Sequence, residues 1–352
     1  MRARALWKNL AFSAVGVGMC FLLLEGAARL MVRPRDTDTH REHERLITVL
    51  GLPALNDTME FDPRLFWRLK PDLRGFRVTG RIREHAVDFT VSTHGTLRSP
   101  PVSPHKKGLR LLALGDSCTF GLGVDDGQTW PAQLEELLRR QEIEADVINA
   151  GVPGYTAFQG LRLLETRGLD LKPDLVIVSF GFNDMDREMP RSDPETARTL
   201  AVTQWESLLI RSRLYYGLKQ ALAPVISRGE DGTTEGRPRL APEEFYETLA
   251  AIEARCEAGT MGMIFLVWPY EAQVVNRYAD LVNYQAVAAR FCRDRGVPAV
   301  NLVQAFIEAK EPLFIDHIHA NAAGCRVAAE AVLPVVVRWA RDREARSKRD
   351  LR

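Results

Sequence analysis

Four short polar segments contain side chains that together can perform nucleophilic catalysis. In chain order they are LLALGDSCTFGLGV at 111–124, NAGVPGYT at 149–156, GFND at 181–184 and DHIHANAAG at 316–324. A serine hydroxyl becomes a nucleophile when an imidazole accepts its proton and a carboxylate orients that imidazole. Ser117, His319 and Asp316 can supply these three groups.

Ser117 also has an ordinary structural interpretation. Serine is a favoured N-cap residue, so a buried apolar strand followed by Ser117 is equally typical of a strand-to-helix turn. Cys118 beside it is expected to pack inward rather than act as the nucleophile, because adjacent side chains at a tight turn point in different directions. The presence of all four segments, in order and at predicted strand ends, favours the catalytic interpretation of Ser117.

The remaining segments contain groups that suit an oxyanion and a general base. Two glycines and a proline in NAGVPGYT let the backbone turn with its amides exposed, as an anion site requires. GFND places the side-chain amide of Asn183 at the same predicted sheet edge. Asp316 and His319 are three residues apart at a turn entering a helix, which can bring a carboxylate against an imidazole. His317 between them is expected to be structural.

Strands and helices alternate from Gly108 onward, and this alternation predicts how the segments are positioned. Short buried strands are predicted at 109–114, 146–149, 174–180, 263–267 and 299–302. Helices are predicted at 130–141, 157–167, 242–258, 278–295 and 321–341. Such a pattern predicts an α/β domain in which helices cover both faces of a parallel sheet. Ligands then bind at the carboxyl ends of the strands, where Ser117 is expected to lie.

The rest of the composition excludes several classes of function. Lys and Arg number 47 against 46 Asp and Glu, so no basic field is available to attract nucleic acid, and no nucleic-acid motif is present. The five cysteines are scattered without C-x-x-C spacing, which predicts neither a zinc site nor a disulfide framework. No metal and no cofactor are therefore expected.

The amino terminus is expected to be a transmembrane signal anchor covering 1–36. Arg2, Arg4 and Lys8 precede an apolar run at 10–24. As a helix this run would be roughly 23 Å long, which is short for a hydrocarbon core of about 30 Å, although Lys8 can extend toward the interface. A cleaved signal peptide and a buried helix of a soluble domain are the alternatives. The anchor predicts a single-pass membrane protein whose catalytic domain lies outside the cytoplasm.

The remaining chain divides by composition into four further parts. A tether is predicted at 37–60, and a small β-rich lead-in at 61–107, with turns at Thr79-Gly80 and His94-Gly95. The main domain follows at 108–341 and is interrupted by an insertion at 185–241, of which SRGEDGTTEGRPR is expected to be a flexible polar loop. A charged tail is predicted at 342–352.

The four segments together resemble the SGNH, or GDSL, hydrolase superfamily over roughly 109–337. The resemblance implies a flavodoxin-like three-layer α/β/α sandwich with a central parallel sheet. It also implies that Ser117 is the nucleophile and that Asp316 and His319 complete a catalytic triad. No G-x-S-x-G surrounds the serine, so a nucleophile elbow of the α/β-hydrolase type is not expected.

The same resemblance implies an oxyanion hole. Its donors would be the backbone amides of Ser117 and Gly154 and the side-chain amide of Asn183, with Gly151 as an alternative to Gly154. Such donors stabilise the charge that develops on the carbonyl oxygen in acyl transfer. Every catalytic position of the family pattern is filled in this sequence, although His317 stands where glycine is common.

The expected function is that of a serine esterase that cleaves a carboxylic ester through an acyl-enzyme at Ser117. An O-acyltransferase that uses the same triad on a cell-envelope polysaccharide is the first alternative, and a catalytically inactive binding module is the second. Chains with an anchor, a β-rich lead-in and this domain resemble bacterial envelope proteins that add or remove acyl groups on polysaccharides. An acylated envelope carbohydrate or lipid is therefore the expected substrate class.

Overall fold

A five-stranded parallel sheet forms the centre of the computed structural model, which describes residues 16, 19–29, 52–102, 105, 106, 108–189, 191–198, 214 and 236–350. Its strands are β5 (Leu109–Gly115), β6 (Ala145–Gly151), β7 (Leu175–Ser179), β8 (Gly262–Val267) and β9 (Ala299–Asn301). They lie in the order β6-β5-β7-β8-β9, and every neighbouring pair is parallel. Numbered along the chain, this is the 2-1-3-4-5 order of a flavodoxin-like doubly wound sheet. The predicted α/β class with a central parallel sheet is confirmed.

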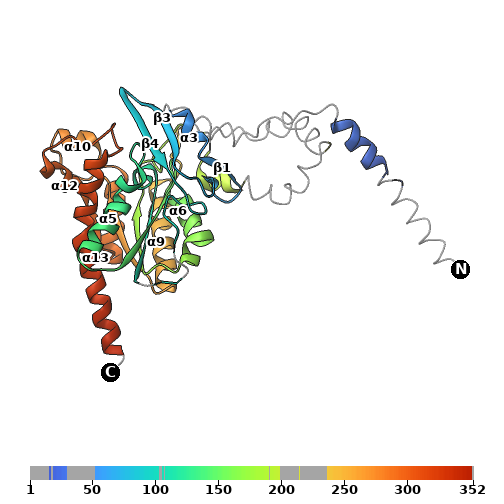
Figure 1. The fold of residues 1–352 in the computed structure, drawn as a ribbon. Helices are drawn as coiled ribbons and strands as arrows, with labels where there is room; N and C mark the ends of the chain where they lie inside the picture. The colour runs from blue at the N-terminus through green and yellow to red at the C-terminus, as the bar shows by residue number, and fades with distance from the viewer. Residues whose placement is uncertain are drawn as a thin grey trace.

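Helices cover both faces of the sheet, as the strand sequences require. Because successive strand residues point to opposite faces, a strand buried on both sides is apolar throughout. In β5, Leu112 and Leu114 pack into one core, while Leu111 and Ala113 pack into the other. The first core includes residues of α6 (Ala157–Leu163), α9 (Pro242–Ala258) and α11 (Tyr284–Arg295). The second includes residues of α5 (Trp130–Arg140), α12 (Leu302–Ala309) and α13 (Ala322–Asp350) (Figure 1).

Several element boundaries differ from those predicted. Helix α11 begins at Tyr284 rather than at 278, and Asn283 directly before it has a positive φ of 49°, which is incompatible with a continuous α-helix. Helix α6 ends at Leu163 and continues as a wider π turn over Leu164–Gly168. Helices α10 (Glu271–Val275) and α12 were not predicted, and α13 continues past the predicted end at 341 to Asp350.

The β-rich lead-in consists of two antiparallel hairpins. Strand β1 (Met59–Asp62) pairs with β2 (Phe66–Leu69), and β3 (Phe76–Ile82) pairs with β4 (His85–Val91). The predicted turn at Thr79-Gly80 is wrong, because both residues lie inside β3. Burial of Val78 and Ile82 on either side keeps that strand continuous despite the weak strand preference of glycine. Short helix α3 (Pro53–Asn56) precedes the hairpins, and β3 and β4 lie at one end of the domain (Figure 1).

Arg98 joins the lead-in to the main domain. Its side chain is 1% exposed and donates to the carboxylate of Asp126 at 2.9 Å. It also donates to four backbone carbonyls, those of Thr90, Phe120, Gly121 and Val124. Its guanidinium lies 4.4 Å from the centre of the Phe120 ring. Through Arg98 the lead-in therefore stabilises the loop that follows α4 (Ser117–Phe120). This helix begins at the predicted nucleophile, Ser117.

Parts of the predicted N-terminal organisation lie outside the described residues. Residues 19–29 are helical, and no helix in the described ranges combines the length and apolar character needed to cross a membrane. Most of the predicted anchor at 1–36 and most of the insertion at 185–241 fall outside the description. The last part of the predicted tether, 52–60, instead packs into the core, since Leu52 and Leu55 are fully buried.

Candidate active site

The first three polar segments meet at one edge of the sheet because three neighbouring strands end in register. Gly115 at the end of β5 pairs with Gly151 of β6 and with Ser179 of β7. The loops that follow these strands therefore leave the sheet side by side. Close backbone packing fixes their entry, since a Cβ on Gly151 would lie 2.1 Å from the amide nitrogen of Phe120. Only glycine fits at this point.

Ser117 is the first residue of α4, and the capping residue is Asp116. The Asp116 carboxylate accepts a hydrogen bond from the backbone amide of Cys118 at 2.9 Å, which is the N-cap interaction of this short helix. Gly121, with φ of 82°, ends the helix in a left-handed conformation. The alternative in which Ser117 caps the helix is therefore wrong. The Ser117 hydroxyl is free to make a different contact.

Ser117, His319 and Asp316 form one chain of hydrogen bonds. His319 Nε2 lies 2.8 Å from Ser117 Oγ, and His319 Nδ1 lies 2.8 Å from Asp316 Oδ2. The second carboxylate oxygen, Asp316 Oδ1, accepts from the backbone amides of Ile318 at 2.9 Å and His319 at 2.7 Å. All three side chains are buried. The structure thus brings the first and fourth segments together, although Ser117 and His319 are 202 positions apart in the sequence.

The environment keeps Asp316 ionised. Burial alone would raise the pKa of this carboxyl group, but the hydrogen bond and charge of His319 and the two backbone amides outweigh it. The pKa of Asp316 is therefore held well below its usual range. An ionised carboxylate on Nδ1 leaves Nε2 as the nitrogen that faces Ser117 and can accept its proton. This arrangement can activate a hydroxyl as a nucleophile.

The loop that supplies His319 is held in place by its own hydrogen bonds. The backbone amide of Ile315 donates to the carbonyl of His319 at 2.7 Å. The carbonyl of Ile318 accepts from Trp268 Nε1 at 2.9 Å. Asn321 closes the loop, because its side chain accepts from the amide of Gly324 at the start of α13 and donates to the carbonyl of Pro312. His319 is therefore presented by a fixed loop.

The three predicted oxyanion donors also converge on this edge. Asn183 Nδ2 donates to the carbonyl of Tyr155, the residue after Gly154, at 2.9 Å. The same nitrogen lies 3.5 Å from Oδ2 of Asp116, the residue before Ser117. Gly154 has φ of 78°, a conformation that favours glycine. Within the described part of the chain, the amides of Ser117 and Gly154 make no hydrogen bond to protein.

Gly151 is less suited than Gly154 to the oxyanion role. Its backbone amide already donates to Asn149 Oδ1 at 2.9 Å. A donor that is occupied within the protein has to break that bond before it can stabilise an oxyanion. The geometry therefore favours Gly154 over the alternative that the sequence left open.

Two other residues near the triad have no assigned part in proton transfer. Cys118 is 3% exposed and packs into the second core, and burial raises the pKa of its thiol well above the usual value. His317 is half-buried, and its ring lies 5.3 Å from that of Phe182. Burial lowers the pKa of His317. Cys256 and Cys292 are buried free thiols.

Asp184, the last residue of GFND, fixes the turn that carries Asn183. Its carboxylate accepts from the backbone amides of Ala157 at 2.8 Å and Gly181 at 2.9 Å, and its side chain is fully buried. Burial raises its pKa to about 7, against the hydrogen bond from Ala157 that favours the ionised form. Burial likewise raises the pKa of Asp116 to about 6. Both carboxyl groups act through backbone hydrogen bonds that shape the site.

A buried ion pair that the sequence did not reveal lies behind the Gly154 turn. Arg239 and Asp193 are 1% and 3% exposed, and Arg239 Nε lies 2.9 Å from Asp193 Oδ1. Arg239 also donates to the carbonyl of Gly154 and to Gln159 Oε1, each at 2.7 Å. Asp193 Oδ2 accepts from Thr156 Oγ1 at 2.5 Å. The assignment of Arg239 to a flexible polar loop is therefore wrong, because this residue is buried against the site.

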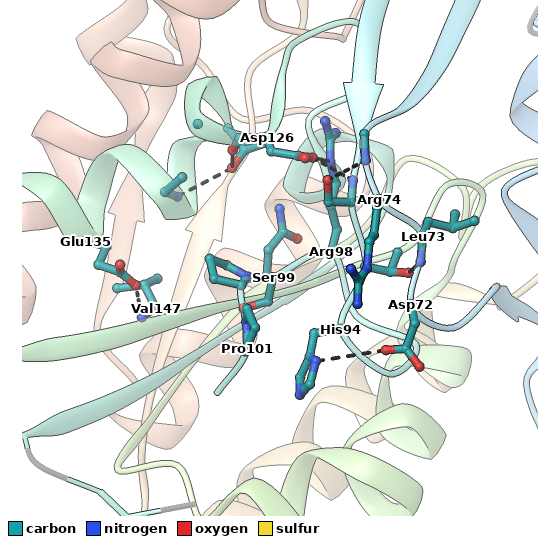
Figure 2. Close-up of a pocket in the computed structure, with 18 residues that line it drawn as sticks. Asp72, Leu73, Arg74, His94, Arg98, Ser99, Pro101, Asp126, Glu135 and Val147 are labelled. Carbon is teal, nitrogen blue, oxygen red and sulfur yellow. Dashed lines mark hydrogen bonds and ion pairs between the residues drawn. The ribbon is translucent and has the colours of Figure 1, made fainter. Parts of the chain in front are cut away.

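A cavity of about 810 Å³ lies between the lead-in and the β6 edge of the sheet (Figure 2). Asp72, Arg74 and His94 line it from the lead-in, and Glu135 and Val147 line it from the domain. The described residues that line this cavity do not include Ser117, Asp316 or His319. The cavity is therefore distinct from the hydrogen-bonded chain described above.

The chain is similar to two curated esterases over part of their length. It is 38% identical over 79 residues to the esterase TesA of Pseudomonas aeruginosa, covering 22% of this chain and 39% of that protein. It is 35% identical over 81 residues to the arylesterase of Vibrio mimicus, and this match covers 23% of this chain and 40% of that protein. The chain thus spans about two fifths of the length of these relatives. The chain also matches the crystal structure of the lipase/acylhydrolase from Enterococcus faecalis with a TM-score of 0.44 and 17% sequence identity. This match covers 65% of this chain and 95% of the Enterococcus chain.

A family-wide comparison covers a larger part of the chain. The model of the GDSL-like Lipase/Acylhydrolase family matches residues 113–327, which is more than half of the 352 residues. The matched range contains all the residues assigned above to the triad and the oxyanion hole. The resemblance found in the sequence is confirmed, and the chain belongs to the GDSL-like lipase/acylhydrolase family of ester-hydrolysing enzymes.

Proposed function

We propose that this chain is a serine esterase that cleaves carboxylic esters through an acyl-enzyme at Ser117. The observation that carries the proposal is the buried chain of hydrogen bonds from Ser117 Oγ through His319 to Asp316, with both links at 2.8 Å. A hydroxyl, an imidazole and an ionised carboxylate in this order are the parts of a serine hydrolase triad. Membership of an ester-hydrolysing family supports the same reaction.

The proposed reaction has two steps. In the first, His319 Nε2 accepts the Ser117 proton while Oγ bonds to the acyl carbon. His319 then returns that proton to the leaving alcohol as the ester C–O bond breaks. In the second, His319 accepts a proton from water, the resulting hydroxide displaces Ser117 from the acyl carbon, and the serine is protonated again. Asp316 stabilises the imidazolium that forms in each step.

The amides of Ser117 and Gly154 and the side chain of Asn183 would stabilise the oxyanion in both steps. Preorganised donors of this kind usually supply the largest single part of the rate enhancement. Asn183 Nδ2 is held by the Tyr155 carbonyl at 2.9 Å, whereas its contact with Asp116 at 3.5 Å is long. The hydrogen on the Asp116 side is therefore the one that an oxyanion can capture.

Asn183→Ala is expected to lower kcat by roughly 10²–10³, about 2.7–4 kcal/mol, because one oxyanion donor is lost while Ser117 still attacks. Steady-state hydrolysis of an aryl ester by purified, folded variants measures this effect. Asn276→Ala is the matched control, since among the described residues the side chain of this exposed asparagine donates only to the carbonyl of Ala272 in α10. Equal kcat for wild type and Asn183→Ala would remove Asn183 from the oxyanion hole.

The substrate class that we propose is an acylated carbohydrate or lipid of the cell envelope. Two relatives that this chain matches in part are called esterase and arylesterase, so aryl esters of graded chain length are suitable first probes. A screen of these esters beside acetylated glycans would rank acyl length and alcohol. Adding a sugar acceptor tests the alternative of acyl transfer, because transfer would form a new sugar ester at the expense of free acid. A folded chain that turns over no ester in this screen would contradict the proposal.

We further propose that the N-terminal segment anchors the protein, with the catalytic domain outside the cytoplasm. The support is the sequence itself, in which Arg2, Arg4 and Lys8 precede the apolar run at 10–24. Full-length protein is expected in the membrane fraction, and a reporter fused after Arg352 is expected to work outside the cytoplasm. Recovery of unprocessed protein in the soluble fraction, or a reporter active only in the cytoplasm, would contradict the anchor.

A further inference from the structure

The peptide group between Pro153 and Gly154 is held from the lead-in by Trp67. Trp67 lies on β2 and is 3% exposed, and its indole Nε1 donates to the carbonyl of Pro153 at 3.0 Å. The two residues are 86 positions apart in the sequence, so the contact depends on how the lead-in packs. The amide of this same peptide group is the Gly154 N–H that the proposed function places in the oxyanion hole.

The planarity of the peptide bond links these two atoms. In a trans peptide the C=O and N–H vectors lie in one plane and point in opposite directions, and the described chain contains no cis peptide. A hydrogen bond that fixes the Pro153 carbonyl therefore also fixes the direction of the Gly154 amide. We propose that Trp67 is a positioning residue, which aims the Gly154 amide at the oxyanion by holding the carbonyl on the other side of the peptide. The inference rests on the proposed esterase function.

Further contacts make Trp67 a rigid support. The Tyr155 hydroxyl donates to the backbone carbonyl of Trp67 at 2.5 Å, and the two rings meet edge to face with centroids 5.9 Å apart. A Cβ on Gly154 would lie 3.1 Å from the Trp67 ring, so the indole packs directly against the turn. The hairpin itself is tied to α6, because Gln159 Nε2 donates to the carbonyl of Leu65 at 2.8 Å.

The next peptide group is held by a different part of the chain. Arg239 Nη1 donates to the carbonyl of Gly154 at 2.7 Å, and the Arg239 guanidinium lies 5.7 Å from the centre of the Trp67 ring. Two consecutive carbonyls of the turn therefore have donors from two different parts of the chain. With both planes fixed, the Gly154 amide has little freedom to turn away from the site.

This role lies outside the part of the chain that defines the family. The family match begins at residue 113, whereas Trp67 belongs to the lead-in that precedes it. The lead-in then does more than connect the N-terminal segment to the domain, because it supplies a support on which the oxyanion donor depends. Its contribution is expected to appear in kcat rather than in substrate binding, since Trp67 acts on a group that bonds most strongly in the transition state.

The test is hydrolysis of an aryl ester by the full-length Trp67→Phe variant, which keeps an aromatic ring and loses the N–H donor. Active sites are counted by titration with a phosphonate, so that misfolded molecules do not lower the measured kcat. We expect kcat per active site to fall about 10- to 100-fold, while KM changes by less than about twofold. This fall in kcat is smaller than the one expected when an oxyanion donor itself is removed. Incorporating benzothienylalanine at position 67, which keeps the ring shape and lacks the N–H, is expected to give the same fall and covers the case in which Trp67→Phe does not fold.

Trp130→Phe is the matched control. Trp130 is also buried, but its Nε1 has no hydrogen-bond partner among the described residues. Its kcat per active site is expected to stay within about twofold of wild type. A wild-type kcat for both position-67 variants, or an equal fall in Trp130→Phe, would overturn the role of Trp67. Full turnover by Ser117→Ala would instead refute the esterase mechanism itself, so the two failures are distinguishable.

Discussion

Ser117→Ala is expected to lower kcat for ester hydrolysis by about 10⁶-fold, because no other atom replaces Oγ in forming the acyl-enzyme. The variant is expected to fold, since Asp116 rather than Ser117 caps α4. Its free energy of unfolding should fall by only about 1 kcal/mol, the cost of leaving His319 Nε2 without its partner. Steady-state turnover and urea unfolding of the same purified protein measure both quantities.

A hydroxyl that does cap a helix provides the control for Ser117. Thr129 Oγ1 accepts a hydrogen bond from the amide of Ala132 at the start of α5. Helix α5 packs on one face of the sheet, whereas α6 and α9 pack on the other. Thr129→Ala is expected to cost about 1 kcal/mol of stability and to leave turnover unchanged. Ester turnover by Ser117→Ala at the wild-type rate would mean that the turn at GDSC is structural only.

His319→Ala is expected to lower kcat by a similar factor of about 10⁶, because residues of a triad act as a unit and the loss of the base disables the nucleophile. Asp316→Ala should lower it by about 10⁴, since the imidazole remains but loses its orientation and its counter-charge. Both values come from hydrolysis of the same aryl ester by folded variants, with folding checked by circular dichroism.

His317→Ala separates the assigned base from its neighbour. His317 lies two residues from His319 but is half-buried against Phe182 and has no proton to transfer in the proposed reaction. Its removal should change kcat far less than removal of His319. A loss of activity in His317→Ala with normal turnover in His319→Ala would reverse the assignment.

The meeting of Ser117, Gly154 and Asn183 at one edge was predictable because it depends on a rule about sheets. Apolar runs identified the strands, and the carboxyl ends of parallel strands lie at one edge, so polar residues directly after those runs had to meet there. The structure places Ser117, Gly154 and Asn183 in the segments that directly follow β5, β6 and β7, with Ser117 at the start of α4. It adds Asp116 as the cap of α4, which settles the structural alternative for Ser117.

The supports of the site were not predictable in the same way. Arg239 sits in a polar segment whose composition is typical of an exposed loop, yet it is buried because Asp193 and Gly154 lie opposite it. In the sequence Trp67 is typical of a strand residue. The acceptor for its indole N–H is the carbonyl of Pro153, which is 86 positions away in the sequence. Local composition carries no information about such partners, since they are decided by tertiary packing.

The wrong boundaries have a similar cause. The sequence predicts a tether at 37–60, but Leu52 and Leu55 within this range are buried in the same core as residues of the hairpins. The glycine at position 80 suggested a turn, although the register of β3 with β4 carries it through the strand. In each case long-range burial outweighs the local preference.

The most direct measurement of the central claim is the location of a phosphonate adduct on the full-length protein. The oxygen of an activated serine bonds to the phosphorus of a phosphonate probe and displaces its leaving group, which gives a phosphonyl-serine that water does not readily cleave. Intact mass spectrometry is expected to show one phosphonyl group per molecule in parallel with loss of ester turnover, and peptide mapping is expected to place it on Ser117. Ser117→Ala is expected to remain unlabelled. An adduct on a different residue that abolishes turnover, or ester hydrolysis by a protein that the probe never labels, would contradict the account.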